Sequence, residues 1–150
     1  MNVGQDVLGD INVLQTGGPQ NRTWLFLSAH TKAATAHFLS HLRELKAQNI
    51  DDYQVSIKWN GKTLKEMENY RAINIIGCIS CANLENSEFE NLEGMYMFDK
   101  LVINPTKIKS LNLFRVEKAH EYVVVSLELA NQINLKKFSD IQLTPIECSE

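Results

Sequence analysis

Residues 72–79 read Ala-Ile-Asn-Ile-Ile-Gly-Cys-Ile, a nearly continuous apolar run that is rich in isoleucine. Such a run is typical of a strand that is covered on both faces, because β-branched side chains pack well on a pleated sheet and leave little polar surface for water. We therefore predict that residues 72–79 form the central strand of the main sheet, with the other elements arranged around it.

A long N-terminal helix is predicted upstream, from His30 to about Gln48. Its apolar residues recur at spacings of three and four positions, as on the buried face of an amphipathic helix, and no glycine or proline interrupts them. These residues are Ala34, Phe38, Leu42 and Leu45.

Strands are predicted on both sides of this helix. Thr23–Leu27 is a short apolar run bounded by polar residues, which suits a buried strand. Apolar and polar residues alternate over Tyr53–Trp59, as in a strand with one buried face. Because Asn60-Gly61 follows at once and tolerates the positive φ of a type I′ turn, we predict a hairpin over residues 53–65.

Further strands are predicted downstream of the central run, after a polar, acidic segment at Asn83–Gly94. They are Met95–Ile103, Leu111–Val116, Tyr122–Val125 and Phe138–Ile146, the last edged by Pro145. The charged turn Glu117–Glu121 separates the strand that ends at Val116 from the strand that begins at Tyr122. Ser126 is expected to cap a short C-terminal helix, because its hydroxyl can accept a hydrogen bond from an unpaired amide while Glu128 complements the positive helix end.

These elements predict an α+β fold in a single domain. The central sheet is expected to be mostly antiparallel or mixed, with one long N-terminal helix and one short C-terminal helix. The breaker cluster Thr16-Gly17-Gly18-Pro19 indicates that residues 1–21 form an N-terminal arm or a loosely packed segment, and that the domain spans residues 22–150.

Composition narrows the classes of function. The 150 residues are 44% hydrophobic and 22% charged, which is ordinary for one globular domain, and the formal net charge of -3 supplies no positive field for nucleic acid or an anionic membrane. We expect no nucleic-acid partner and no membrane partner. Residues 1–20 lack the pattern of a secretory signal, and the three cysteines are sparse and odd in number, so we expect a cytoplasmic protein without structural disulfides.

Histidines raise the possibility of a metal site. His30, His37 and His41 fall on one stripe of the predicted helix, and two histidines four residues apart can share a metal ion. In a zinc peptidase helix, however, glutamate directly follows the first ligand, and Phe38 stands there in this chain. We therefore favour a polar stripe beside the core, and we expect no cofactor.

Cys78 and Cys81 have the spacing of a zinc knuckle or a redox motif. They lie in or at the end of the predicted central strand, where side chains three positions apart point to opposite faces, and no helix N-terminus follows to lower a thiol pKa. Buried, inert cysteines are the favoured interpretation. A mixed metal site of Cys78 and Cys81 with His37 and His41 stays open as the alternative.

Four glutamates, Glu85, Glu88, Glu90 and Glu93, make the segment after the central strand acidic. Paired carboxylates serve acid–base catalysis when burial shifts their pKa values, and a segment this polar is expected to stay in water. These residues are predicted to form an exposed acidic surface, and any partner that they bind is expected to be a basic protein.

The C-terminal half resembles a known family. Leu113–Val116, Val123–Ser126, the short helix Leu127–Ile133 and Phe138–Pro145 (FSDIQLTP) are similar to the C-terminal signature of the bacterial immunity protein family numbered eleven in polymorphic toxin systems. Tyr70–Glu90 looks like the central strand of that family and the Asn-Ser-Glu segment after it.

This resemblance implies a protein without enzymatic activity that is encoded beside a secreted toxin, binds it and neutralises it. We expect such a protein to act by covering the toxin's active site or substrate groove. It implies no catalytic residues. Glu85, Glu88, Glu90 and Glu93 are the residues that we expect to bind the toxin. Two other functions stay open: a small metal-dependent hydrolase that uses His37 and His41, and an adaptor or chaperone that carries an effector without inhibiting it.

Overall fold

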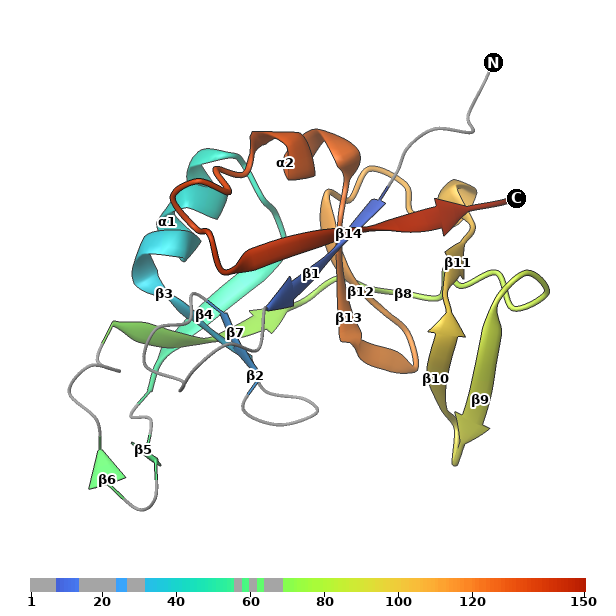
Figure 1. The fold of residues 1–150 in the computed structure, drawn as a ribbon, viewed down its shortest axis with the longest axis horizontal. Helices are drawn as coiled ribbons and strands as arrows, with labels where there is room; N and C mark the ends of the chain where they lie inside the picture. Colours follow the sequence, from blue (N-terminus) through green and yellow to red (C-terminus); the bar gives the residue numbers. More distant parts are fainter. Residues whose placement is uncertain (1–7, 14–23, 27–31, 56–57, 60–61, 64–68) are drawn as a thin grey trace.

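The computed structural model describes residues 8–13, 24–26, 32–55, 58–59, 62–63 and 69–150, and it shows an α+β fold with mixed sheets and two α-helices in these residues (Figure 1). The main sheet has six strands. In order across the sheet they are β11 (Val102–Ile103), β14 (Ile141–Cys148), β1 (Leu8–Val13), β13 (Ala119–Val125), β12 (Leu113–Val116) and β8 (Cys78–Ile79).

A second sheet has four strands, and two hairpins stand beside the sheets. The four strands are, in order, β2 (Trp24–Phe26), β3 (Lys32–Thr35), β7 (Tyr70–Ile75) and β4 (Ile50–Gln54). The hairpins are β5 (Lys58–Trp59) with β6 (Lys62–Thr63), and β9 (Glu88–Leu92) with β10 (Met95–Lys100). The helices are α1 (Ala36–Glu44) and α2 (Leu127–Gln132), and a 3₁₀ turn, η3, spans Pro105–Lys107.

Both faces of the main sheet are covered. Neighbouring residues on β12 point to opposite faces, so Leu113 packs with Phe38 of α1 and Leu129 of α2 in one buried cluster. Phe114 packs in the other cluster, together with Ile103 and other residues of the segment between β8 and β12. The apolar residues of β12 and β13 thus fill two cores, which explains why these strands are almost continuously hydrophobic.

Several predicted elements are confirmed. The predicted strands at residues 111–116 and 122–125 correspond to β12 and β13, and the run Thr23–Leu27 contains β2. The short C-terminal helix is α2, and the Oγ of Ser126 accepts a hydrogen bond from the amide of Leu129 at 3.2 Å, as expected of a cap. No helix among the described residues is long and apolar enough to cross a membrane.

The prediction of a long N-terminal helix is wrong. Lys32–Thr35 forms β3, which pairs with β2 and β7, and α1 begins only at Ala36. Ala34 fits the helical spacing but is buried as a strand residue, because small side chains allow close packing in either state. Pairing with β2 and with the distant strand β7 therefore decides the conformation here, and local periodicity does not.

Helix α1 also ends earlier than predicted. The amide of Ala47 donates to the carbonyl of Leu42 at 2.9 Å and that of Lys46 donates to the carbonyl of Arg43 at 2.9 Å, the two bonds of a Schellman motif. Lys46 has a φ of 59°, the left-handed conformation that this motif requires. Asp52 of β4 then fixes the helix to the second sheet, because its carboxylate binds the guanidinium groups of both Arg43 and Arg71.

Removing the N-cap of α1 is expected to have a moderate effect on stability. The Oγ1 of Thr35 accepts a hydrogen bond from the amide of Phe38 at 3.2 Å. Thr35→Ala should lower the free energy of unfolding by about 1 kcal/mol, because that amide loses its partner. Thr35→Ser retains the hydroxyl and should unfold at nearly the denaturant concentration of the parent protein. Equal unfolding midpoints for all three proteins would contradict the capping role.

The predicted central strand at residues 72–79 is divided between two sheets. Its first part lies in β7, an inner strand of the four-stranded sheet, and its last two residues form β8 at the edge of the main sheet. The chain passes between the sheets at Ile76-Gly77, where a Cβ on Gly77 would lie 3.3 Å from the Cβ of Phe114. The middle strands of the main sheet are instead β1 and β13.

Strand β1 lies within the segment predicted as an N-terminal arm, residues 1–21. Leu8–Val13 pairs antiparallel with β14 over its full length and with β13 at Gly9 and Asp10. This part of the segment is therefore an inner strand of the sheet. Breaker residues 16–19, which suggested the arm, lie outside the described residues.

The predicted hairpin at residues 53–65 is present only in its second half. β5 and β6 pair antiparallel, with Trp59 opposite Lys62, so two residues separate them. Those residues, Asn60 and Gly61, lie outside the described part of the chain. Tyr53 belongs instead to β4, which pairs with β7.

Candidate functional site

The four glutamates predicted to bind a partner lie on or near the β9–β10 hairpin. Glu88 and Glu90 are on β9, Glu93 is in the turn after it, and Glu85 is in the turn before it; all four are exposed. The polar connection predicted at Asn83–Gly94 therefore contains a strand, which is a correction to the sequence analysis. Pairing with residues 95–100 stabilises this strand.

A tight turn closes the hairpin. Glu93 has a φ of 52° and Gly94 a φ of 91°, and two positive φ values in succession are those of a type I′ turn. The amide of Gly94 donates to the Oδ1 of Asn91 at 3.0 Å. The register places Leu92 opposite Met95 and Glu90 opposite Met97. Gly94, which adopts positive φ without strain, is the local signal of this turn in the sequence, whereas Glu93 is not a residue typical of it.

The inner face of the hairpin consists of Phe89, Asn91, Tyr96 and Phe98. The ring centroids of Phe89 lie 4.9 Å from Tyr96 and 5.6 Å from Phe98, and Phe98 lies 6.0 Å from Tyr122 on β13. Edge-to-face aromatic contacts at these distances are favourable. This face attaches the hairpin to the main sheet.

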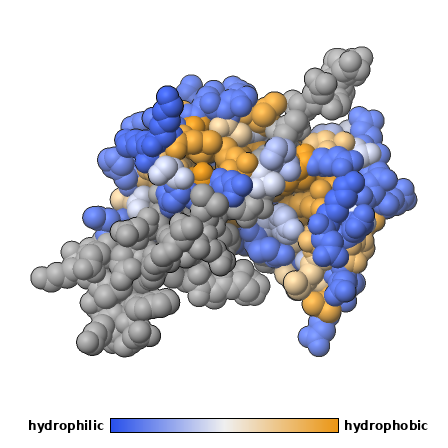
Figure 2. Space-filling view, in the orientation of Figure 1, coloured by the Kyte–Doolittle hydropathy of each residue, from blue (hydrophilic) through white to orange (hydrophobic). Residues whose placement is uncertain are grey.

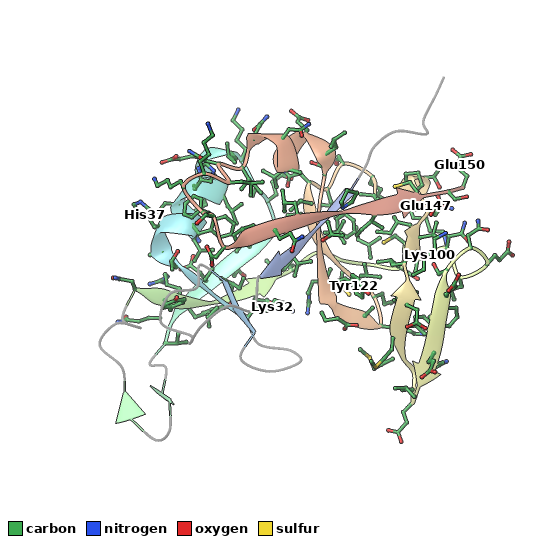
Figure 3. All side chains as sticks on the ribbon, viewed as in Figure 1. Lys32, His37, Lys100, Tyr122, Glu147 and Glu150 are labelled. Atoms are coloured by element: carbon green, nitrogen blue, oxygen red, sulfur yellow. The ribbon has the colours of Figure 1, made fainter. Side chains whose placement is uncertain are left out.

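Polar contacts add to this attachment. The hydroxyl of Tyr122 donates to the carbonyl of Phe98 at 3.3 Å, and the amide of Tyr96 donates to the carbonyl of Lys118 at 2.8 Å. The Nζ of Lys100 lies 2.9 Å from Glu147 on β14, and this hydrogen bond raises the pKa of Lys100 (Figure 3). Contacts on both β13 and β14 therefore hold β10 in place.

The outer face of the hairpin combines carboxylates with apolar side chains. Residues two apart on a strand share a face, and cross-strand partners lie beside them, so this face consists of Glu88, Glu90, Leu92, Met95 and Met97, with Lys100 opposite Glu88 after a bulge. Leu92 is 50% exposed and Met97 is 57% exposed. Figure 2 shows hydrophobic surface at the free end of the hairpin beside strongly hydrophilic surface. The glutamates stand out in the sequence as an acidic group, whereas the two apolar residues do not.

The histidines of the metal alternative lie on α1. The Nε2 of His41 accepts a hydrogen bond from the amide of Asn134 at 3.1 Å, and the ring of His41 lies 5.2 Å from that of Phe138. His37 is exposed, and its ring centroid lies 6.4 Å from Phe138. His30 lies outside the described residues. The contacts of His41 are those of a side chain that fixes the loop after α2.

Cys78 is exposed on edge strand β8, and Cys81 lies on the face of the main sheet opposite to α1. Cys81 is buried in the second core, with Phe114 and Ile103, whereas α1 packs on the first core. Burial raises the pKa of the Cys81 thiol to about 12, so it stays protonated at neutral pH. The structure therefore does not bring Cys81 together with His37 and His41, and it shows no metal-binding group of three or more such residues within the described ranges.

Thiol labelling should distinguish the cysteines. Because the thiolate is the reactive species, Cys81 should resist iodoacetamide at pH 8 in the native protein, whereas the exposed Cys78 should be labelled. Peptide mass spectrometry would locate the modification. In denaturant both should be labelled, which serves as the control for the reagent. Rapid labelling of Cys81 in the folded protein would show that this thiol is accessible and ionised.

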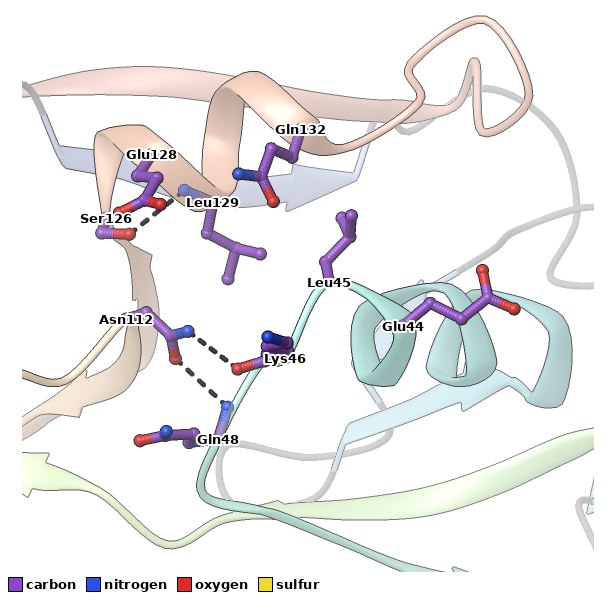
Figure 4. Close-up of a pocket in the computed structure, with 9 residues that line it drawn as sticks. All are labelled: Glu44, Leu45, Lys46, Gln48, Asn112, Ser126, Glu128, Leu129 and Gln132. Carbon is purple, nitrogen blue, oxygen red and sulfur yellow. Dashed lines mark hydrogen bonds between the residues drawn. The ribbon is translucent and has the colours of Figure 1, made fainter.

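A cleft of about 380 Å³ lies between the end of α1 and the start of α2 (Figure 4). Asn112 bridges its wall: its Nδ2 donates to the carbonyl of Lys46 at 3.0 Å, and its Oδ1 accepts from the amide of Gln48 at 3.1 Å. The carboxylates that line the cleft, Glu44 and Glu128, are exposed, and Ser126 serves as a helix cap. The described lining residues include no histidine or cysteine to activate a nucleophile.

No protein-family model matches the chain, and no curated protein is significantly similar to it. The resemblance to the eleventh immunity family therefore stays a prediction from the residue pattern.

Proposed function

We propose that this chain is an immunity protein that binds a cognate secreted toxin and covers its active site or substrate groove. The observation that carries the proposal is the outer face of the β9–β10 hairpin, where exposed Leu92 and Met97 lie beside Glu88 and Glu90. Apolar contacts at the centre of an interface supply affinity, and surrounding charges supply orientation and a fast association rate.

The attachment of the hairpin to the main sheet supports the same proposal. The aromatic contact of Phe98 with Tyr122 and the main-chain bond of Tyr96 to Lys118 attach the hairpin to the main sheet and its neighbouring turn before a partner arrives. A preformed surface avoids part of the entropy cost of binding. This property suits an inhibitor, which must bind at about nanomolar affinity or better to protect a cell.

The hairpin supplies the centre of the proposed interface. Stable complexes bury at least ~1,200 Å² in total, which is more than a two-stranded hairpin offers. Surface beside the hairpin must therefore supply the remaining area. The proposed partner is a basic protein, and the proposed place of action is the cytoplasm.

Co-expression tests the proposal. The product of the neighbouring gene should stop growth when expressed alone and should be harmless when this chain is present. If that product is harmless in both cases, the chain is not its inhibitor and the adaptor function gains support. Metal analysis of the purified chain provides a separate check, because stoichiometric zinc would favour the hydrolase.

A further inference from the structure

One edge of the β9–β10 hairpin is free. β10 lies toward the body of the molecule, where Tyr96 bonds to Lys118, and β9 lies on the outside (Figure 1). Within the described residues β9 pairs with β10 alone. The outer edge of Glu88–Leu92 is therefore open to another strand.

The register shows which main-chain groups point outward. The pair next to a two-residue turn, here Leu92 with Met95, is a hydrogen-bonded pair, and the pairs alternate from there. Tyr96 and Asn91 form the following pair, so their main-chain groups point away from each other. The outward bond from Tyr96 to Lys118 agrees with this alternation. On β9 the amides and carbonyls of Asn91 and Phe89 therefore point to the free edge.

The charges on β9 select the partner. In an antiparallel pair of two copies of β9, glutamates of one copy would lie near glutamates of the other, and such like-charge contacts are unfavourable. A strand that carries lysine or arginine at every second position would place these residues beside Glu88 and Glu90. The free edge thus disfavours a second copy and favours a basic segment.

We propose that an extended, basic segment of the partner protein adds to the outer edge of β9 as a third strand of the hairpin. Main-chain bonds to Phe89 and Asn91 provide the pairing, and ion pairs with Glu88 and Glu90 provide the selection. This inference rests on the proposed function, since it specifies how the toxin is bound.

A peptide titration tests the inference without the toxin. The probe is a blocked peptide, about as long as β9, in which lysine alternates with valine. The control is the same peptide with glutamate in place of lysine. Both are added up to about 1 mM to the full chain, and binding is followed by NMR. The lysine peptide should bind and should slow hydrogen exchange at the amides of Phe89 and Asn91, and the glutamate peptide should not bind.

Two variants separate strand addition from simple charge attraction. Asn91→Pro and Asn91→Ala both lose the side-chain bond to Gly94, but only proline removes the outward amide. Asn91→Pro should bind the lysine peptide about tenfold more weakly than Asn91→Ala, because one main-chain hydrogen bond is lost. Protection of the Met97 amide, which faces β9, in both variants would show that the hairpin remains formed. If the hairpin is lost, slowed exchange at Phe89 and Asn91 in the parent protein tests strand addition instead.

The outcomes separate this inference from the proposed function. Equal binding by both variants, or binding without protection of Phe89 and Asn91, would overturn strand addition, and so would the absence of peptide binding. None of these results affects whether the chain neutralises the toxin in the co-expression experiment. Conversely, failure of co-expression to protect cells would overturn the immunity function, whatever the peptides show.

Discussion

Replacing Phe38 by alanine is expected to lower the free energy of unfolding by about 3–5 kcal/mol. Phe38 is completely buried, and its ring lies 4.9 Å from that of Phe138 in an edge-to-face contact. The substitution removes both the transfer free energy of the ring and its packing against the main sheet, and it leaves a cavity between α1 and the loop after α2. Denaturant unfolding followed by circular dichroism would measure the change.

The matched control is Leu84→Ala. Leu84 is 40% exposed, so its truncation should change the free energy of unfolding by no more than about 0.5 kcal/mol. A loss below about 1 kcal/mol for Phe38→Ala would mean that Phe38 is not enclosed as described, because buried phenylalanines rarely cost so little.

Reversing the charges of Glu88 and Glu90 together is expected to weaken toxin binding by about 100-fold, because like charges placed against a basic surface cost several kcal/mol. Both carboxylates lie on the outer face beside Met97 and Leu92. Isothermal titration calorimetry with the purified toxin would measure the loss for Glu88→Lys with Glu90→Lys. The effect should decrease as salt is added, since exposed charges are screened.

A charge-matched control is available on the helical side of the molecule. Glu44→Lys with Glu128→Lys changes the net charge equally at the cleft between α1 and α2. This control should retain the affinity of the parent protein to within a few fold. Unchanged affinity in the Glu88 and Glu90 variant would remove the outer face from the interface, and equal losses in both variants would indicate a general charge effect.

Elements with strong local signals could be predicted from the sequence. The cap at Ser126, the helix after it and strands β12 and β13 are examples. To cap the helix, Ser126 needs only the amide of Leu129, three residues away. Strand β13 has valines on both faces because each face packs in one of the two cores. Such features depend on neighbours in sequence or on burial, which composition reveals.

Elements that depend on distant pairing could not be predicted in the same way. Lys32–Thr35 is a strand because β7, some forty residues later, lies beside it. The run at residues 72–79 divides because its two ends pair in different sheets. For the candidate site, the sequence indicated the glutamates and a strand from Met95, but not β9, the strand that carries Glu88 and Glu90. Leu92 and Met97 become notable only when the hairpin register places them together on an exposed face.

The place of β1 between β13 and β14 constrains how the chain can fold as it is synthesised. Leu8–Val13 leaves the ribosome long before Ala119–Val125 and Ile141–Cys148, and at ~5–20 residues per second it waits several seconds for its neighbours. Until then the growing chain has neither of the strands that β1 joins. Closure of the main sheet is therefore a late event with a high loop-closure cost, and we expect slow folding compared with helical proteins of this size.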